Sequence, residues 1–519
     1  MNNRMRSDDR ARDRDLALMG TSGNVTMSRR GFLRRATVIT AAASLSTALP
    51  GHVLAQTAPA SGTRVAVIGA GLAGLNAAYR LRQAGITATV YEARNRVGGR
   101  THSIETSSGL VYDLGGSFIN TDHGDMRGLA SELGLTLFDR NKEAARTGLP
   151  STAYYVAGRD VDEATLAADF RPLRDQITAD ARRVFNAWDT VAPEYDQMSV
   201  TQYLDSHQNK ITAPYVRVLV ENAIRTEYGV EPHDSSALQL LFLTPSVTGK
   251  SVDLLAYSDE QYTVSGGSQS IADELVKRLP GQVQLNRPLT RVRRTGSAYT
   301  LDFTGAAPVE ADYVIVTVPA SLLRSISFPS TLPAGFRDYL ANVDLGRNEK
   351  VFAGFETRAW RTSGEFSLGA WTDLGYSSVW DGTQSQIARA DAALTLYYGG
   401  ADVQRIPNGK GAYDAAVRSL DAYVPGLQAA ANGQYRRTNW TGEKYSKGAY
   451  VNFKPGQLTR WGSYFWLETG GGNPTQEVVF DGLVFAGEHT SDDWYGFMNG
   501  AAQTGRLAAT AVRNRINAR

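Results

Sequence analysis

The chain has no cysteine among its 519 residues, and histidine is scarce, with six residues. A disulfide framework is therefore excluded, so the hydrophobic core must hold the fold without covalent help. The histidines show no ligand spacing such as His-Glu-x-x-His, so the sequence predicts no metal site. Hydrophobic residues make up 42% of the chain, which at this length leaves room for the cores of two domains.

A large excess of positive charge is also lacking. The whole chain has a formal net charge of +2, but residues 1–35 hold nine arginines and four aspartates, so the remainder carries a charge of −3. No basic patch is left to suggest a nucleic-acid partner. A long hydrophobic run is missing too: the uncharged residues 36–49 are too few and too rich in Ala, Ser and Thr for stable membrane insertion.

The N-terminal segment has the features of an export signal. The stretch Ser-Arg-Arg-Gly-Phe-Leu-Arg-Arg at 28–35 resembles a bacterial twin-arginine motif, and small residues up to Ala55 suggest a cleavage site. We therefore expect residues 1–55 to be a signal peptide that sends the folded protein to the periplasm or outside the cell. An arginine-rich structural arm is the alternative, and the start codon, Met1 or Met27, stays open.

A glycine-rich turn follows the first expected strand. The apolar run 64–68 leads directly into Gly69, Gly71 and Gly74, and the helix that follows is expected to end at Gly85. In this arrangement the first glycine permits the tight turn, the second admits a pyrophosphate, and the third lets the helix pack close to its strand. The helix N-terminus then directs free N–H groups at the phosphates.

A second strand, 86–91, ends at Glu92, about twenty residues after the glycines. An acid at this position accepts a hydrogen bond from a ribose hydroxyl and would repel a 2′-phosphate, which disfavours NADP. Strand, turn, helix and acid together predict a Rossmann-like α/β domain that binds a dinucleotide.

The motifs that follow resemble the flavin-containing amine oxidase family, which includes monoamine, polyamine and L-amino-acid oxidases. The likeness rests on Glu-Ala-Arg at 92–94, Arg-Val-Gly-Gly-Arg-Thr at 96–101 and Asp-Leu-Gly-Gly-Ser at 113–117. It implies FAD as the cofactor, with the second glycine turn and an arginine on the other side of the pyrophosphate. The residues it places at the cofactor here are Arg94, Gly99, Arg100, Gly116, Ser117 and, through its backbone beside the adenine, Val292.

The likeness returns near the end of the chain, in residues 482–490 and in a helix expected from about Gly496. In the family this helix points its N-terminus at the flavin pyrimidine, where its dipole stabilises the charge that reduction places near N1. The resemblance therefore implies that Gly487, Glu488, Phe497 and Met498 lie against the cofactor.

Three further positions carry the chemistry that the resemblance implies. Lys350 matches the lysine that contacts flavin N5 through a water, while Tyr450 and Phe497 match the two rings that hold a neutral amine before the flavin. The alternatives are a solvated lysine and ordinary core aromatics. Ala449 stands where some relatives attach FAD through cysteine, so FAD is expected to be bound non-covalently.

The motifs also suggest how the chain is divided. The FAD domain is expected to combine 63–120, 257–344 and 444–519, with a helix at 271–279 and strands near 283–285 and 314–318. An α+β substrate-binding domain is expected from 121–256, mostly helical, and 345–443, mostly strand. A homodimer is an expectation that rests on the family alone.

The resemblance implies an oxidase that deaminates a primary amine or L-amino acid to an imine, then to a carbonyl and ammonia, while O2 becomes H2O2. An amino acid needs a cation for its carboxylate. The Pro-Met-Arg setting of animal L-amino-acid oxidases is absent from 117–123, so Arg225 is the candidate, with a helix-end charge as the alternative. A flavin desaturase acting on a bulky apolar substrate and a non-catalytic exported flavoprotein stay open as other functions.

Overall fold

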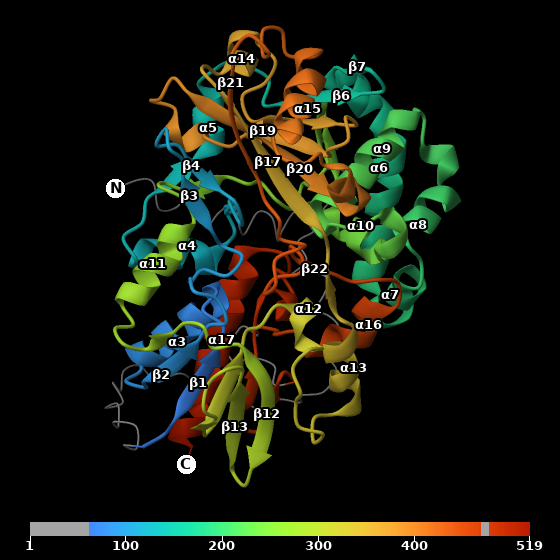
Figure 1. The fold of residues 1–519 in the computed structure, drawn as a ribbon. Helices are drawn as coiled ribbons and strands as arrows, with labels where there is room; N and C mark the ends of the chain where they lie inside the picture. The colour runs from blue at the N-terminus through green and yellow to red at the C-terminus, as the bar shows by residue number, and fades with distance from the viewer. Residues whose placement is uncertain (1–61, 469–476, 519) are drawn as a thin grey trace, which may run out of the picture.

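The computed structural model describes residues 62–468 and 477–518. The expected signal peptide, 1–55, lies outside the described residues. The chain builds two large sheets, one in the lower half of the view in Figure 1 and one in the upper half. The described helices include none that is long and apolar enough to cross a membrane.

The first sheet has six strands contributed by distant parts of the chain. Five of the six run parallel, and the edge strand β23 is antiparallel. This confirms the parallel α/β architecture expected from the glycine motif, since β1 is buried along its whole length. The strand order is β11 (Val283–Gln284), β2 (Ala88–Tyr91), β1 (Val65–Ile68), β15 (Tyr313–Val316), β24 (Leu483–Phe485) and β23 (Val479–Phe480).

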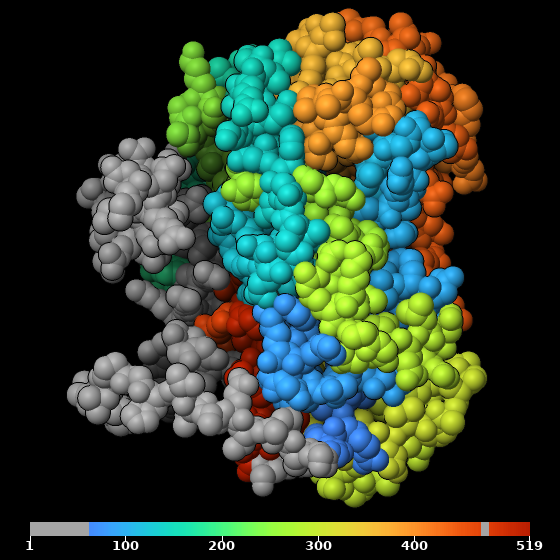
Figure 2. Space-filling model, turned by 90° about the vertical axis from the view of Figure 1, so that its left-hand side faces the viewer, coloured from blue at the N-terminus to red at the C-terminus, as the bar shows by residue number. Residues whose placement is uncertain are grey.

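Two helices from opposite ends of the sequence pack together beside this sheet. Helix α3 (Leu72–Gln83) begins at the glycine turn, and α17 (Met498–Asn517) lies against it. Gly505 makes the contact possible, because a Cβ atom there would come within 2.3 Å of the Ala73 carbonyl oxygen. Helix α11 (Gln269–Lys277) also contacts α3. Figure 2 shows the same discontinuity at the surface, where blue segments adjoin yellow-green ones.

The second sheet has seven mixed strands. Its central strands β17 and β20 are buried at every residue, so they form the core of this half of the molecule. Helix α15 (Lys410–Asp421) packs against β17 and β21. The order is β21 (Ala431–Arg437), β17 (Asn348–Phe355), β20 (Ala392–Gly399), β19 (Ser378–Asp381), β18 (Gly369–Thr372), β6 (Thr152–Val156) and β7 (Arg159–Asp160).

The segment 121–256 is mostly helical, as expected, but it also supplies strands to the second sheet. Strand β6 pairs in parallel with β18, more than two hundred residues further along the chain. Such a long-range pairing leaves no local pattern in the sequence, so the mostly helical expectation for 121–256 does not include these strands. The helices are α6 (Glu163–Asn186), α7 (Trp188–Asp196), α8 (Val200–Ser206), α9 (Pro214–Tyr228) and α10 (Ala237–Leu243), seen at the right of Figure 1.

The strands of the six-stranded sheet fall within the segments assigned to the FAD domain, and those of the seven-stranded sheet fall within the others. The domain boundaries themselves stay a prediction. The smaller elements that matter for the site are β3 (Ser103–Glu105), β4 (Val111–Asp113), α4 (Gly124–Glu132), β5 (Leu137–Asp139), α5 (Arg140–Ala145), β8 (Ser246–Thr248), β9 (Ser251–Asp253), β10 (Tyr262–Val264), β12 (Leu289–Thr295), β13 (Ala298–Phe303), β14 (Val309–Ala311), β16 (Asp344–Leu345) and β22 (Val451–Asn452).

Candidate active site

A cavity of about 680 Å³ lies between the two sheets. Its lining begins at the carboxyl ends of the parallel strands β1, β2, β15 and β24, and it continues to residues of β17, β18, β19 and β20. Ligands of open parallel sheets bind at this carboxyl edge. The cavity is therefore placed so that a dinucleotide on the first sheet and a substrate against the second can share one space.

Two glycine turns meet at the dinucleotide end of the cavity. Gly71 and Gly98 form a parallel bridge, and a Cβ atom on Gly99 would lie 3.1 Å from the Gly71 Cα. Helix α3 has no side-chain cap at its N-terminus, which leaves its first backbone N–H groups for a ligand. Gly69 and Gly71 line the cavity, whereas Gly74 packs against the turn, because its Cβ would lie 2.0 Å from the Gly69 carbonyl oxygen.

The acid at the end of β2 is buried and held in place. Glu92 is 3% exposed, and its carboxylate accepts hydrogen bonds from the backbone N–H groups of Ala70 (2.8 Å) and Arg94 (2.9 Å). It lines the cavity beside the glycine turn. The Arg94 guanidinium, which also lines the cavity, donates to Ser446 Oγ at 2.7 Å. The geometry fits an acid that accepts from a ribose hydroxyl.

Arg100 joins the second glycine turn to the C-terminal part of the chain. Its Nη1 donates to Glu488 Oε1 at 2.8 Å and to the Ala449 carbonyl oxygen. Glu488 in turn accepts from the Gly496 N–H at 2.9 Å, just before α17 begins. These residues line the cavity together with Gly487, Phe497 and Met498, so both ends of the sequence build one site.

Lys350 lies in β17 with its ammonium group buried at the cavity wall. Its side chain donates to the carbonyl oxygens of Asp113 (2.9 Å) and Gly115 (2.7 Å) and to Ser117 Oγ (2.7 Å). Burial lowers the pKa of Lys350 to about 8. The residue is 7% exposed, so the alternative of a solvated surface charge is wrong.

The turn at 113–117, which accepts the hydrogen bonds of Lys350, also approaches the start of α17. A Cβ atom on Gly116 would come within 2.9 Å of Met498 Sδ, so the turn packs closely against the Met498 side chain. Both residues line the cavity, as does Ser117. The Lys350 turn, the helix N-terminus and the glycine cradle thus surround one continuous space.

Tyr450 and Phe497 both line the cavity. The Tyr450 hydroxyl donates to the Thr226 carbonyl oxygen at 3.1 Å. The Phe497 ring lies edge-on to His123 at 5.0 Å and to Tyr257 at 5.8 Å between ring centroids. Burial lowers the pKa of His123 to about 3, so the imidazole is neutral, and its Nδ1 accepts a hydrogen bond from the Asn120 N–H at 3.0 Å. The roles of the two rings toward an amine stay predictions.

Several lining residues had no signal in the sequence. Trp380 and Tyr397 stand edge to face at 5.2 Å, and the Lys350 ammonium lies 5.6 Å from the Trp380 ring centroid. Desolvation raises the pKa of Glu260 to about 7 and that of Asp253 to about 6. These residues come from separate strands and loops, so only the tertiary structure brings them together. Other acids and cations on the wall are Glu163, Glu227, Asp259 and Arg140.

Besides Gly74, two of the expected site residues lie outside the cavity lining. The Val292 N–H donates to the Ser327 carbonyl oxygen at 2.8 Å within the β12 region, and the side chain is 1% exposed. Arg225 pairs with Glu231 at 2.7 Å and donates to Asn222 Oδ1 at 2.9 Å. Because its guanidinium is engaged there, Arg225 is not placed to hold a substrate carboxylate.

The residues present fit FAD. A glycine cradle with an uncapped helix N-terminus suits the pyrophosphate, Glu92 suits the ribose, and the start of α17 lies at the same cavity. Gly69, Gly71, Gly99 and Glu92 would hold the dinucleotide end, whereas Gly116, Ser117, Lys350 and Met498 would face the ring system.

Comparisons with known proteins agree with this geometry. The sequence is 27% identical over 483 residues to the flavin-containing amine oxidase B of Canis lupus familiaris, covering 86% of this chain and 85% of that protein. The human amine oxidase B is 26% identical over 480 residues, covering 86% of this chain and 85% of that protein.

Solved structures show the same fold. Putrescine oxidase bound to putrescine superposes with a TM-score of 0.72 at 25% identity, covering 87% of this chain and 99% of that one. Cyclohexylamine oxidase from Brevibacterium oxydans superposes with a TM-score of 0.73 at 22% identity, covering 88% and 99%. The family described as flavin containing amine oxidoreductase matches residues 72–513. The chain therefore belongs to the flavin-containing amine oxidoreductases, FAD-dependent enzymes that oxidise amines.

Proposed function

We propose that the enzyme oxidises a primary amine or an L-amino acid to an imine, which water hydrolyses to a carbonyl compound and ammonia. FAD would supply the redox chemistry: oxidation of the neutral amine to the imine releases two electrons and two protons, and these reduce O2 to H2O2. The observation that carries the proposal is the position of Lys350, whose buried ammonium borders the cavity that also holds the glycine cradle.

The protein residues have three tasks in this reaction. Tyr450 and Phe497 on the wall provide an apolar surface, which favours the neutral amine because a desolvated ammonium is costly. Lys350 holds the turn at Ser117 beside the reacting end of the cavity. Its lowered pKa also lets it exchange a proton with a water near neutral pH.

The relatives support an amine as substrate, since putrescine, the molecule bound in the putrescine oxidase structure, is an amine. A desaturase that acts on a bulky apolar substrate fits less well, because acids line the cavity near the second sheet.

We also propose that FAD is bound without a covalent link and that the protein is exported after folding. Ala449 lines the cavity where some relatives carry the linking cysteine, and the chain has no cysteine. The twin-arginine-like motif at 28–35 supports export of a folded, FAD-loaded protein. Expression of the full chain followed by cell fractionation tests the location, and purely cytoplasmic activity would contradict it.

Anaerobic bleaching of the yellow holoenzyme tests the proposed reaction. Primary amines, polyamines and L-amino acids are added separately under anaerobic conditions, and air is then admitted while H2O2 is assayed. Bleaching by one class, followed by peroxide on reoxidation, is the expected result. A flavin that stays oxidised with every compound would move the assignment to the desaturase or to a non-catalytic flavoprotein.

A further inference from the structure

A buried arginine lies at the cavity wall, outside the strands of the two large sheets. Arg140 is the first residue of α5, is 3% exposed and lines the cavity. Its guanidinium carbon lies 4.0 Å from the Phe118 ring centroid. Phe118 directly follows Ser117, the residue that accepts a hydrogen bond from Lys350. The positive charge of Arg140 is therefore close to the Lys350 end of the cavity.

The hydrogen bonds of Arg140 leave part of the guanidinium free. Nε donates to Gln384 Oε1 at 3.2 Å, and Nη1 donates to the Glu260 carbonyl oxygen at 2.9 Å. Among the described residues, its one ion pair is with Glu260 Oε2, at 3.5 Å from Nη1. Nη2 makes no hydrogen bond to any of the described residues. A buried guanidinium normally meets a carboxylate with both arms of its fork, so this one lacks its usual partner.

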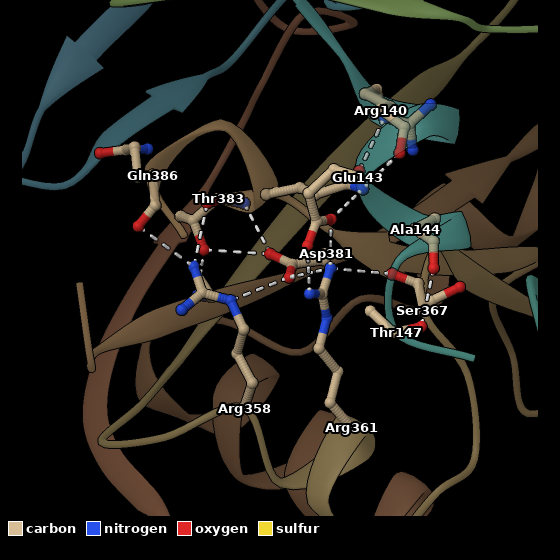
Figure 3. A network of polar contacts seen from close by, with 12 residues as sticks. Arg140, Glu143, Ala144, Thr147, Arg358, Arg361, Ser367, Asp381, Thr383 and Gln386 are labelled. Carbon is tan, nitrogen blue, oxygen red and sulfur yellow. Dashed lines mark hydrogen bonds and ion pairs between the residues drawn. The ribbon is translucent and has the colours of Figure 1, made fainter. Parts of the chain in front are cut away.

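A neighbouring arginine shows what a complete pairing looks like in the same protein. Arg361 donates to both carboxylate oxygens of Glu143, at 2.7 and 2.9 Å. Asp381, whose side chain is fully buried, accepts from Arg358 at 3.1 Å. Figure 3 shows these carboxylates facing Arg358 and Arg361. Glu143 and Asp381 thus pair with the other two arginines, and the ion pair of Arg140 is the longer one with Glu260, at 3.5 Å.

The same network holds Arg140 in position. Gln384 Nε2 donates to the Arg140 carbonyl oxygen at 2.9 Å and to Glu143 Oε2 at 2.7 Å. The Oε1 atom of the same amide accepts the hydrogen bond from Arg140 Nε. One amide therefore connects the arginine to the paired acids behind it. A guanidinium that is fixed from behind and open toward a cavity is preorganised for an incoming anion.

Glu260 is a weak partner for this arginine. It has a φ of +41°, a left-handed conformation that is strained for a non-glycine residue, and its N–H donates to Asn120 Oδ1 at 3.1 Å. Desolvation raises the pKa of its carboxyl to about 7. Because Glu260 meets Arg140 through one oxygen at 3.5 Å, a carboxylate from outside that reaches the open side of Arg140 would compete with a long, single contact.

We propose that Arg140 binds the carboxylate of the substrate, so that the enzyme prefers amino acids to the corresponding simple amines. This inference rests on the proposed amine oxidation and names its substrate class. Phe118, which lies beside Arg140, and Trp380, which lies beside Lys350, stand edge to face at 5.4 Å, so the two cations border neighbouring parts of one cavity wall. Arg140 thereby replaces Arg225 as the carboxylate anchor.

Matched substrate pairs test the inference on the holoenzyme. L-Phenylalanine is compared with 2-phenylethylamine and L-lysine with 1,5-diaminopentane, which differ within each pair by the carboxylate alone. In R140M we expect kcat/KM for the amino acids to fall by about 30-fold or more, with less than a threefold change for the amines. R225M is the matched control, because Arg225 lies outside the cavity lining, and both ratios should stay near those of the wild type.

A binding measurement provides a readout that does not depend on turnover. Benzoate is titrated into the oxidised holoenzyme, and the change in flavin absorbance reports occupancy. We expect saturable binding by the wild type and by R225M, and a dissociation constant at least tenfold higher in R140M. R140K, which keeps the charge but not the fork, is expected to lie between them and serves if R140M does not fold.

The outcomes separate this inference from the function on which it rests. If no compound bleaches the flavin, the proposed oxidation is wrong. If amines bleach it, but the wild type prefers them and R140M and R140K leave that preference unchanged, the carboxylate subsite is wrong and the oxidation stands. A preference for 1,5-diaminopentane over every amino acid would also contradict the carboxylate subsite. The acids on the cavity wall would then be assigned to binding the second ammonium group of the diamine.

Discussion

The Nζ of Lys350 donates a hydrogen bond to Ser117 Oγ at 2.7 Å. This contact connects β17 of the second sheet to the loop that follows β4, 233 residues earlier in the chain. The cofactor side and the substrate side of the cavity are therefore joined by one buried ammonium.

Lys350→Met should slow flavin reduction or reoxidation by at least tenfold while FAD stays bound. The substitution removes the ammonium and leaves the Asp113 and Gly115 carbonyl oxygens without their donor. Anaerobic stopped-flow absorbance measures both half-reactions, and K277M, at an exposed lysine, is the control. Unchanged rates would remove Lys350 from the mechanism.

The rate of the lysine-dependent half-reaction should depend on pH with an apparent pKa near 8. Burial lowers the pKa of Lys350 from its ordinary value to about 8, so the ammonium is protonated below that pH and loses its proton above it. Rate profiles from pH 6 to pH 10 measure this. The step near pH 8 should vanish in K350M, and its persistence would assign it to another group.

Glu260→Gln should raise the melting temperature by about 2–4 °C at pH 8 and change it little at pH 5. Desolvation raises the folded-state pKa of Glu260 to about 7, so its ionisation opposes folding as the pH rises from the unfolded-state pKa through 7. At pH 5 the folded protein holds the acid neutral, and the amide is then a close substitute. Thermal melts at the two pH values provide the comparison; an equal shift at both would contradict the pKa assignment.

Phe497→Ala should lower kcat/KM for the best substrate by about tenfold or more, whereas F497Y should stay within about threefold. The Phe497 ring lines the cavity and packs edge-on against His123 and Tyr257. Alanine would open this apolar surface to water. Steady-state kinetics and FAD content are measured together. Equal activity in F497A and the wild type would make Phe497 an ordinary core residue.

Gly74→Ala should destabilise the protein by about 2 kcal/mol or more and reduce FAD binding. A Cβ atom there would lie 2.0 Å from the Gly69 carbonyl oxygen, so the glycine turn itself would have to move. Gly128→Ala in α4 is the matched control, because its Cβ would meet nothing within 4 Å. We expect G128A to be neutral or slightly stabilising. Similar losses in both variants would argue against the close approach.

The sequence by itself determined the cofactor half of the protein. The glycines at 69, 71 and 74 and the acid at 92 follow one another along a strand, a turn, a helix and a strand, so their relative positions are set by local geometry. The buried apolar runs of β1, β15 and β24 likewise predict parallel strands without knowledge of their partners. The family motif was sufficient to single out Lys350.

Only the tertiary structure decided the substrate half. Arg140, Trp380 and Tyr397 lie on different elements, and no spacing in the sequence indicates that they reach the same cavity. The sequence also does not show that Arg225 pairs with Glu231, because this contact depends on the turn at Gly229 after α9. Local sequence patterns predict whether a segment forms a helix or a strand. A charged side chain becomes a binding group only when the packing of the whole chain leaves it without a charged partner.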